Sequence, residues 1–197
     1  MAVTTFFGRP LEANPSNQVR HRRQPTVLVA DDSQSLAVGA NVGVRFGVMR
    51  SGRVLGVSYW RREANMNGPH VASLWNDSAQ QVRRALFPPI DLVEGWNSVM
   101  FPEPFEVTVA QPTIPPTFFA AVFTNSYSSS PNFFSSQLTE WNWGNQGNNM
   151  FIPAAHIPIH PSSRSGNGVF SYGNPDAFPD QTFNQSNYFV DVIFEPS

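Results

Sequence analysis

The stretch that decides the fold is residues 187–194, which read Asn-Tyr-Phe-Val-Asp-Val-Ile-Phe. Successive side chains of a β-strand point to opposite faces, so residues two apart share a face. One face of this stretch carries only large apolar side chains, those of Tyr188, Val190, Val192 and Phe194; the other carries Phe189, Asp191 and Ile193. The spacing predicts a strand with one wholly apolar face, which closes a sheet near the end of the sequence.

Composition favours β-structure and gives few hints of chemistry. The 197 residues predict one domain, or one domain with an appendage. Aromatic and charged residues each make up 13%, there are 18 Pro and 13 Gly, and there is no Cys. Such a chain suits short strands joined by turns, and it excludes disulfides and thiolate metal sites. Low charge predicts a surface that meets other protein.

The charge and the N-terminus limit the partners and the location. A net charge of −2 gives no reason to expect nucleic acid or an anionic membrane as a partner. No apolar run approaches the roughly 20 residues that a membrane span needs, and residues 1–10 do not read as a secretory signal. We therefore expect export by another route, or release within a particle by lysis.

Residues 1–34 differ from the rest and predict an extended N-terminal arm. They contain three prolines, a basic cluster at residues 20–23 and one short apolar piece at residues 27–29. We expect a neighbouring subunit to hold the arm, by strand pairing through residues 27–30 and by side-chain anchors. Nucleic-acid contact by the basic cluster is the weaker alternative. The predicted anchors are Phe6, Phe7, Leu11, Arg20, Arg22, Arg23, Val27 and Val29.

Alternating apolar residues begin at residue 35. Residues 42–48 and 53–61 both alternate, and Arg50-Ser51-Gly52 between them reads as a tight turn, so we predict a β-hairpin. In the second strand, Leu55, Val57 and Tyr59 are expected on one face and Val54 on the other. Further strands are predicted at residues 70–76, 81–87, 95–101, 105–109, 118–124 and 169–172, with 118–124 central because both of its faces are apolar.

These strands predict an all-β domain over residues 35–197, an antiparallel β-sandwich of the jelly-roll type behind the extended N-terminal arm. Residues 125–168 interrupt the pattern as a long loop rich in Ser, Asn and aromatic residues. Aromatic rings beside amides and hydroxyls suit either a glycan or a protein interface. The predicted contact residues are Tyr127, Phe133, Phe134, Trp141, Asn142 and Trp143.

Catalytic and metal motifs are weak, and we predict no enzyme, no cofactor and no metal site. His156 and His160 are four apart, but nearby prolines forbid the helix that would align them. Asp31-Asp32 could contribute to a Ca²⁺ site, although a turn role is the simpler interpretation. The loop carboxylates Glu94, Glu140, Asp176 and Asp180 form no pair fixed by spacing, and no nucleophile elbow or phosphate loop occurs.

Three stretches together resemble a known bacterial and phage domain family of unknown function. They are residues 43–46 with 52–60, residues 72–75 leading to Gly95-Trp96, and residues 167–173 with 178–179 and 186–194. The resemblance covers residues 32–195. It implies a carbohydrate-binding-like β-sandwich, found in secreted multi-domain proteins and in phage virion proteins such as minor tail proteins, without catalytic residues to carry over.

The resemblance and the arm together predict a non-enzymatic phage virion structural protein. A minor tail or tail-tip protein and a capsid decoration protein both fit. The expected partners are other virion proteins, copies of the same chain and a host cell-surface glycan; the expected location is the phage particle. The alternative is a stand-alone carbohydrate-binding module of a secreted or cell-surface protein, located outside the cell.

Overall fold

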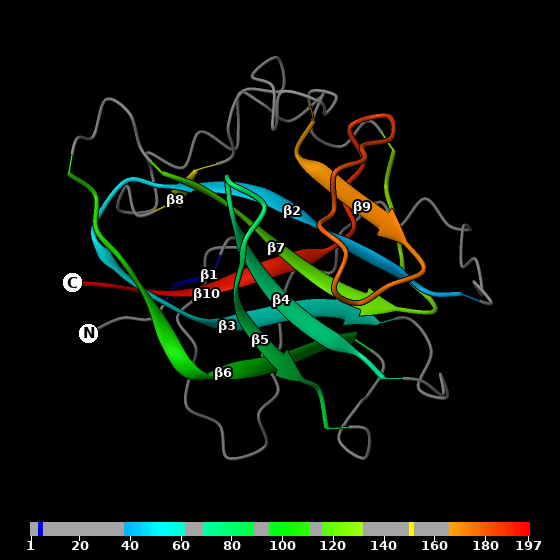
Figure 1. Cartoon of the computed structure of the whole chain (residues 1–197), viewed down its shortest axis with the longest axis horizontal. Helices are drawn as coiled ribbons and strands as arrows, with labels where there is room; N and C mark the ends of the chain where they lie inside the picture. Colours follow the sequence, from blue (N-terminus) through cyan, green and yellow to red (C-terminus); the bar gives the residue numbers. More distant parts are fainter. Residues whose placement is uncertain are drawn as a thin grey trace.

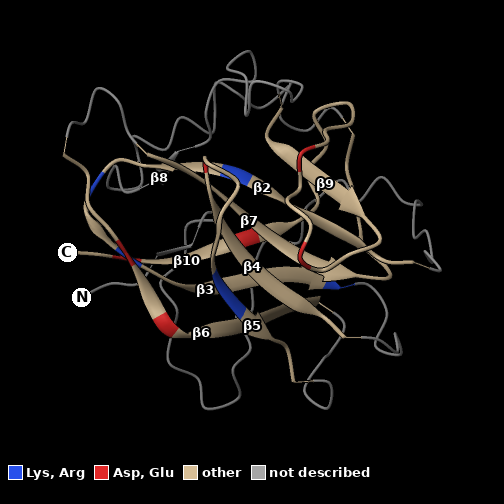
Figure 2. Ribbon diagram, in the orientation of Figure 1, with Lys and Arg blue, Asp and Glu red and all other residues tan. Residues whose placement is uncertain are grey.

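The computed structural model describes residues 38–61, 69–88, 95–110, 116–131 and 166–197, together with the backbone of residues 4–5 and 150–151. In these ranges every secondary-structure element is a β-strand, which confirms the all-β prediction. The same ranges contain no helix able to span a membrane. Charged residues are few along the described strands (Figure 2).

The strands form two antiparallel sheets, here called sheet A and sheet B (Figure 1). Sheet A has the order β1–β10–β3–β6, with β1 at Thr4–Thr5, β10 at Val190–Pro196, β3 at Gly52–Arg61 and β6 at Gly95–Val107. Sheet B has the order β5–β4–β7–β2, with β5 at Gln81–Leu86, β4 at Val71–Asn76, β7 at Thr117–Thr124 and β2 at Ala40–Val48.

Two short strands complete sheet B on the free side of β2. β8 (Met150–Phe151) pairs with Gly47 and Val48, whereas β9 (Gly168–Tyr172) pairs with residues 40–44. β8 and β9 therefore lie at opposite ends of the same strand. The predicted central position of residues 118–124 is confirmed, because β7 lies between β4 and β2.

The two sheets pack face to face around one hydrophobic core, so the chain is a β-sandwich. Tyr188, Val190, Val192 and Phe194 all lie in this core, which confirms the predicted apolar face, although the strand begins at Val190 and not at Asn187. Burying such a set of side chains is the main favourable term in folding, at about 1.5–3 kcal/mol for each large one. The jelly-roll subtype stays a prediction.

The predicted hairpin of residues 42–48 and 53–61 is wrong. β2 belongs to sheet B and β3 to sheet A, so residues 49–51 carry the chain from one sheet to the other. Both strands turn apolar side chains toward the same core. An alternating pattern does not distinguish two strands that lie side by side from two that face each other. The hairpin that forms instead joins β4 and β5.

Two further details of sheet A differ from expectation. Residues 95–101 and 105–109 were predicted as separate strands, but residues 95–107 form one strand with an irregularity opposite residues 54–56 of β3. This bulge reverses the alternation of β3, so Val54 shares the core with Val57 and Tyr59, although the pattern placed Val54 on the opposite face. Pro102 and Pro104 fit here because β6 is an edge strand.

Candidate functional site

An aromatic cluster at one end of the sandwich is the best candidate site among the described residues. We define it as Tyr127, Phe170, Tyr172 and Tyr188. The rings of Tyr127 and Tyr188 meet edge to face with centroids 5.6 Å apart. Phe170 lies 6.2 Å from Tyr188 and 5.3 Å from Tyr172. The chain of rings runs from the core to the surface, where Tyr172 is 50% exposed.

Three segments bring these rings together. Tyr172 ends β9, opposite Ala40 at the start of β2. Tyr127 follows β7, whose Thr124 pairs with the same Ala40. Tyr188 precedes β10, and its neighbour Asn187 exchanges two backbone hydrogen bonds of 2.9 Å with Ser130. Segments far apart in the sequence thus converge because the start of β2 organises this end of sheet B.

The turn before β10 has an unusual backbone. Asn184, Gln185 and Phe189 have positive φ angles of 44°, 46° and 52°. This left-handed region is tolerated by Asn but is uncommon for a bulky residue such as Phe. The Phe189 amide donates to Asn187 Oδ1 at 2.8 Å, and the Phe189 carbonyl accepts from the Trp60 amide at 2.9 Å. These bonds hold the chain in a strained conformation directly beside Tyr188.

Burial keeps the central tyrosine neutral. Desolvation raises the pKa of Tyr188 well above its ordinary value, and the nearby phenols of Tyr127 and Tyr172 raise it further, against a hydrogen bond with Ser186. A neutral phenol donates and accepts hydrogen bonds but supplies no charge. The cluster therefore offers ring faces and hydroxyls, which suit binding better than acid–base catalysis.

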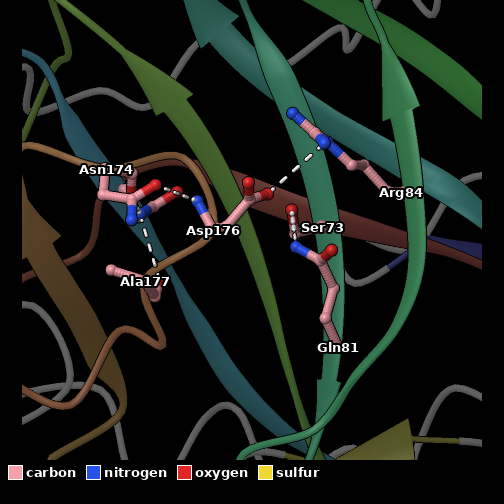
Figure 3. A network of polar contacts seen from close by, with 7 residues as sticks. Ser73, Gln81, Arg84, Asn174, Asp176 and Ala177 are labelled. Atoms are coloured by element: carbon pink, nitrogen blue, oxygen red, sulfur yellow. Dashed lines mark hydrogen bonds and ion pairs between the residues drawn. The ribbon is translucent and has the colours of Figure 1, made fainter.

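A polar network fixes the loop after β9 on the outer face of sheet B. The buried Asn41 side chain donates to Ser171 Oγ, to the Asn174 carbonyl at 2.7 Å and to the Ala177 carbonyl at 3.1 Å. Figure 3 shows Asp176 in this loop directed toward Arg84 of β5, at 3.4 Å. The same view shows Gln81 donating to Ser73 between the two strands of the hairpin. The network supports the end of β9, where Tyr172 lies.

Aromatic packing also holds the loop after β9 against sheet B. Phe178 meets Trp75 of β4 and Phe119 of β7 edge to face, at 5.7 and 5.0 Å. On sheet A, the rings of Trp60 and Trp96 meet edge to face across β3 and β6, with centroids 5.9 Å apart. Trp60, Trp75 and Trp96 therefore serve core or inter-strand packing.

The structure places only part of the predicted site. Tyr127 joins the aromatic cluster. The other predicted contact residues lie outside the described residues: Phe133, Phe134, Trp141, Asn142 and Trp143. The eight arm anchors also lie outside them, as do the four residues considered for metal binding, His156, His160, Asp31 and Asp32. Among the described residues, no three His, Cys, Asp or Glu side chains gather as metal ligands. Of the loop carboxylates considered for catalysis, Asp176 pairs with Arg84.

Sequence reasoning missed three members of the cluster. Tyr188 was assigned to the core face of the last strand, and Phe170 and Tyr172 only to a returning strand. A usable signal was present, since Phe170 and Tyr172 alternate on one face and Tyr172 precedes Gly173 at the strand end. What the sequence lacked was the register that places β9 at the start of β2.

The fold and the cluster define a β-sandwich domain with an aromatic patch at one end. A family model described as a domain of unknown function, DUF4082, matches residues 22–190. The chain belongs to this family. The match begins inside the stretch predicted as the arm and ends at the first residue of β10. No curated protein matches the sequence.

Proposed function

We propose that this chain is a non-enzymatic structural protein of a phage particle, as a minor tail or tail-tip protein or a capsid decoration protein. The sandwich is the body, and the N-terminal arm joins it to other virion proteins and to copies of itself. The observation that supports this proposal is that Thr4 and Thr5 form a strand, which within the chain pairs with Phe194 and Ile193 of β10. This part of the arm acts by adding a strand to a sheet, a general mode of protein recognition.

The surface supports the same proposal. The whole chain has only 12 basic and 14 acidic residues, few for its size. A weakly charged surface lowers the desolvation cost of packing against neighbours. In a symmetric particle, many weak contacts of this kind together give tight attachment.

A second candidate function is favoured by the exposed ring of Tyr172. A glycan-binding module needs an apolar ring face with hydroxyl and amide groups nearby, because sugars present both C–H faces and hydroxyls. Tyr172 supplies an exposed ring and phenol, and the partly exposed Tyr127 belongs to the same cluster. The carbohydrate-binding-like character implied by the family resemblance belongs to this candidate, either on a particle or in a stand-alone extracellular module.

Deleting residues 1–34 separates the two candidates. If the chain is a virion protein, the shortened chain is expected to stay folded by circular dichroism but to be missing from purified particles. If it is a stand-alone module, glycan-array binding is expected to survive the deletion and to be lost on Tyr172→Ala. Met100→Ala, at a half-exposed position of β6 in sheet A, is the matched control and should change neither result.

A further inference from the structure

The outer edge of β10 has room for one short strand only. The Val192 amide donates to the side chain of Asp191 at 2.7 Å, so it does not serve an incoming strand. Pro196 has no amide hydrogen to give. Between them lie residues 193–195, and the pairing seen with Thr4 and Thr5 falls on Ile193 and Phe194. Since a free strand edge is a template for association, this restriction selects the length and register of whatever pairs there.

The other described edges of the sandwich are less receptive. β6 contains Pro102 and Pro104, and Arg83 of β5 donates to the carbonyls of Glu103 at 2.8 Å and Pro104 at 3.0 Å. Arg83 also donates to the Val82 carbonyl at the edge of β5. β9 is bridged on its free side by Gln181, through hydrogen bonds of 2.8 and 3.0 Å with Phe170. Proline, charge and bridging each discourage strand addition.

We propose that the β10 edge is the site at which copies of this chain join, each receiving the Thr4–Thr5 strand of a second copy in place of its own. Residues 6–39 separate β1 from β2 along the sequence and can span on the order of 100 Å when extended, so a neighbour's edge is within reach. A two-residue pairing holds its strand weakly within one chain. In a particle, adjacent copies hold a neighbour's strand at a high effective concentration, which lets it compete with pairing inside one chain. The inference rests on the proposed virion function, which supplies the adjacent copies.

A disulfide between two different chains tests this exchange, because the natural chain contains no cysteine. Thr5 and Ile193 are partners in the register, within the distance that a disulfide bridges. Chains carrying only Thr5→Cys and chains carrying only Ile193→Cys are expressed together, purified and oxidised. We expect a covalent dimer on a non-reducing gel, with the two cysteines linked in its peptide map. Linkage only when both substitutions are in one chain would overturn the inference.

Met100→Cys is the matched control for position. Met100 is half exposed. It lies on β6, two strands away from β10, and is aligned with Ile193 because Gly56 of β3 pairs with both residues. Thr5→Cys and Met100→Cys should give no linked product, in one chain or in two. A cross-link here would mean non-specific capture and would also overturn the inference.

Ile193 is fully buried, so a measurement that leaves it intact guards against a folding defect. A nitroxide is attached to Thr5→Cys, and this protein is unfolded and refolded together with ¹⁵N-labelled natural chain. Exchange is expected to broaden the amide signals of Ile193 and Phe194 in the labelled copies. If broadening appears only when nitroxide and ¹⁵N are in the same chain, the Thr4–Thr5 strand pairs only within its own chain and the inference fails. The virion proposal is judged separately, by the particle content of the 1–34 deletion.

Discussion

Tyr59 and Tyr188 are buried phenols, and their burial predicts how stability depends on pH. Desolvation raises the pKa of both side chains well above the ordinary value of about 10. The folded state therefore prefers the neutral phenol. The corresponding stability is fully present below the unfolded-state pKa and is lost as the pH rises above it. We expect the free energy of unfolding in urea to stay level from neutral pH to about 9 and to fall above about 10.

The composition makes this alkaline transition easy to assign. The chain has no lysine and no cysteine, so tyrosines are the side chains that titrate in this range. Tyr188→Phe should reduce the alkaline loss, whereas Tyr172→Phe, at the half-exposed end of the cluster, should keep most of it. An alkaline loss that is unchanged in Tyr59→Phe and Tyr188→Phe would contradict the assignment.

At the scale of elements, Arg83 joins the two sheets where β5 of sheet B lies beside β6 of sheet A. Its guanidinium reaches two carbonyls of β6 from β5 and lies 5.4 Å from the centre of the Phe105 ring. A charge-assisted hydrogen bond contributes about 1.5–3 kcal/mol; of these two, the bond to Pro104 is partly buried and the bond to Glu103 is exposed. We expect Arg83→Ala to lower the unfolding free energy by about 2 kcal/mol in urea denaturation and to promote aggregation by opening the edge.

The neighbouring Arg84 is the natural control. It is largely exposed and pairs with Asp176 at 3.4 Å, so Arg84→Ala should change stability by less than about 0.5 kcal/mol. Equal losses from the two substitutions would show that charge, not the bridge between β5 and β6, matters here.

Gly168 permits the close approach on which the aromatic cluster depends. A Cβ atom at this position would collide with the carbonyl oxygen of Ser186, in the turn that leads to Tyr188. Gly168→Ala should therefore displace β9 from that turn and cost about 1–3 kcal/mol, measured by urea denaturation. The shift should also appear as altered tyrosine fluorescence. Gly173→Asn, where the φ of +81° suits Asn and no atom lies within 4 Å, should be mild by comparison.

The elements themselves were largely predictable, whereas their partners were not. Period-two alternation located β2, β3 and β4, because that pattern reports which side chains face a core, and a run that is apolar on both faces located β7. The same pattern carries no information on which strand lies alongside. Residues 50–52 therefore read as a hairpin turn, although they cross between sheets. The bulge at residues 54–56 was also missed, although Gly56 inside the strand is the kind of residue that marks a bulge.

At the scale of the whole molecule, β1 contributes little to the stability of the body. Only two of its residues pair with β10, whereas all seven residues of β10 pair with β3. Removing residues 1–5 should leave the far-ultraviolet circular dichroism intact and lower the unfolding free energy by about 1–2 kcal/mol.

Substituting both threonines by valine is the control, because it keeps the backbone pairing and should leave stability nearly unchanged. Loss of cooperative unfolding on removing residues 1–5 would show instead that β1 belongs to the core of the fold.

The candidate site was predictable only at Tyr127. The sequence favoured aromatic residues of the segment 125–168 because rings and amides occur there together, but the described cluster draws its other members from β9 and from the residue pair before β10. A site assembled from remote segments depends on sheet order, which local composition does not encode. The Ser130–Asn187 pairing is one such long-range contact.

The path of the chain between the sheets has a consequence for biosynthesis. β3 lies between β6 and β10, so sheet A lacks one of its inner strands until residues 190–196 have left the ribosome. Until then, one long edge of β3 is open, although every described strand of sheet B precedes β10 in the sequence. Folds whose paired strands are far apart in the sequence form slowly and populate aggregation-prone intermediates. A nascent chain stalled before residue 190 is thus expected to recruit chaperones, and one released at full length is not.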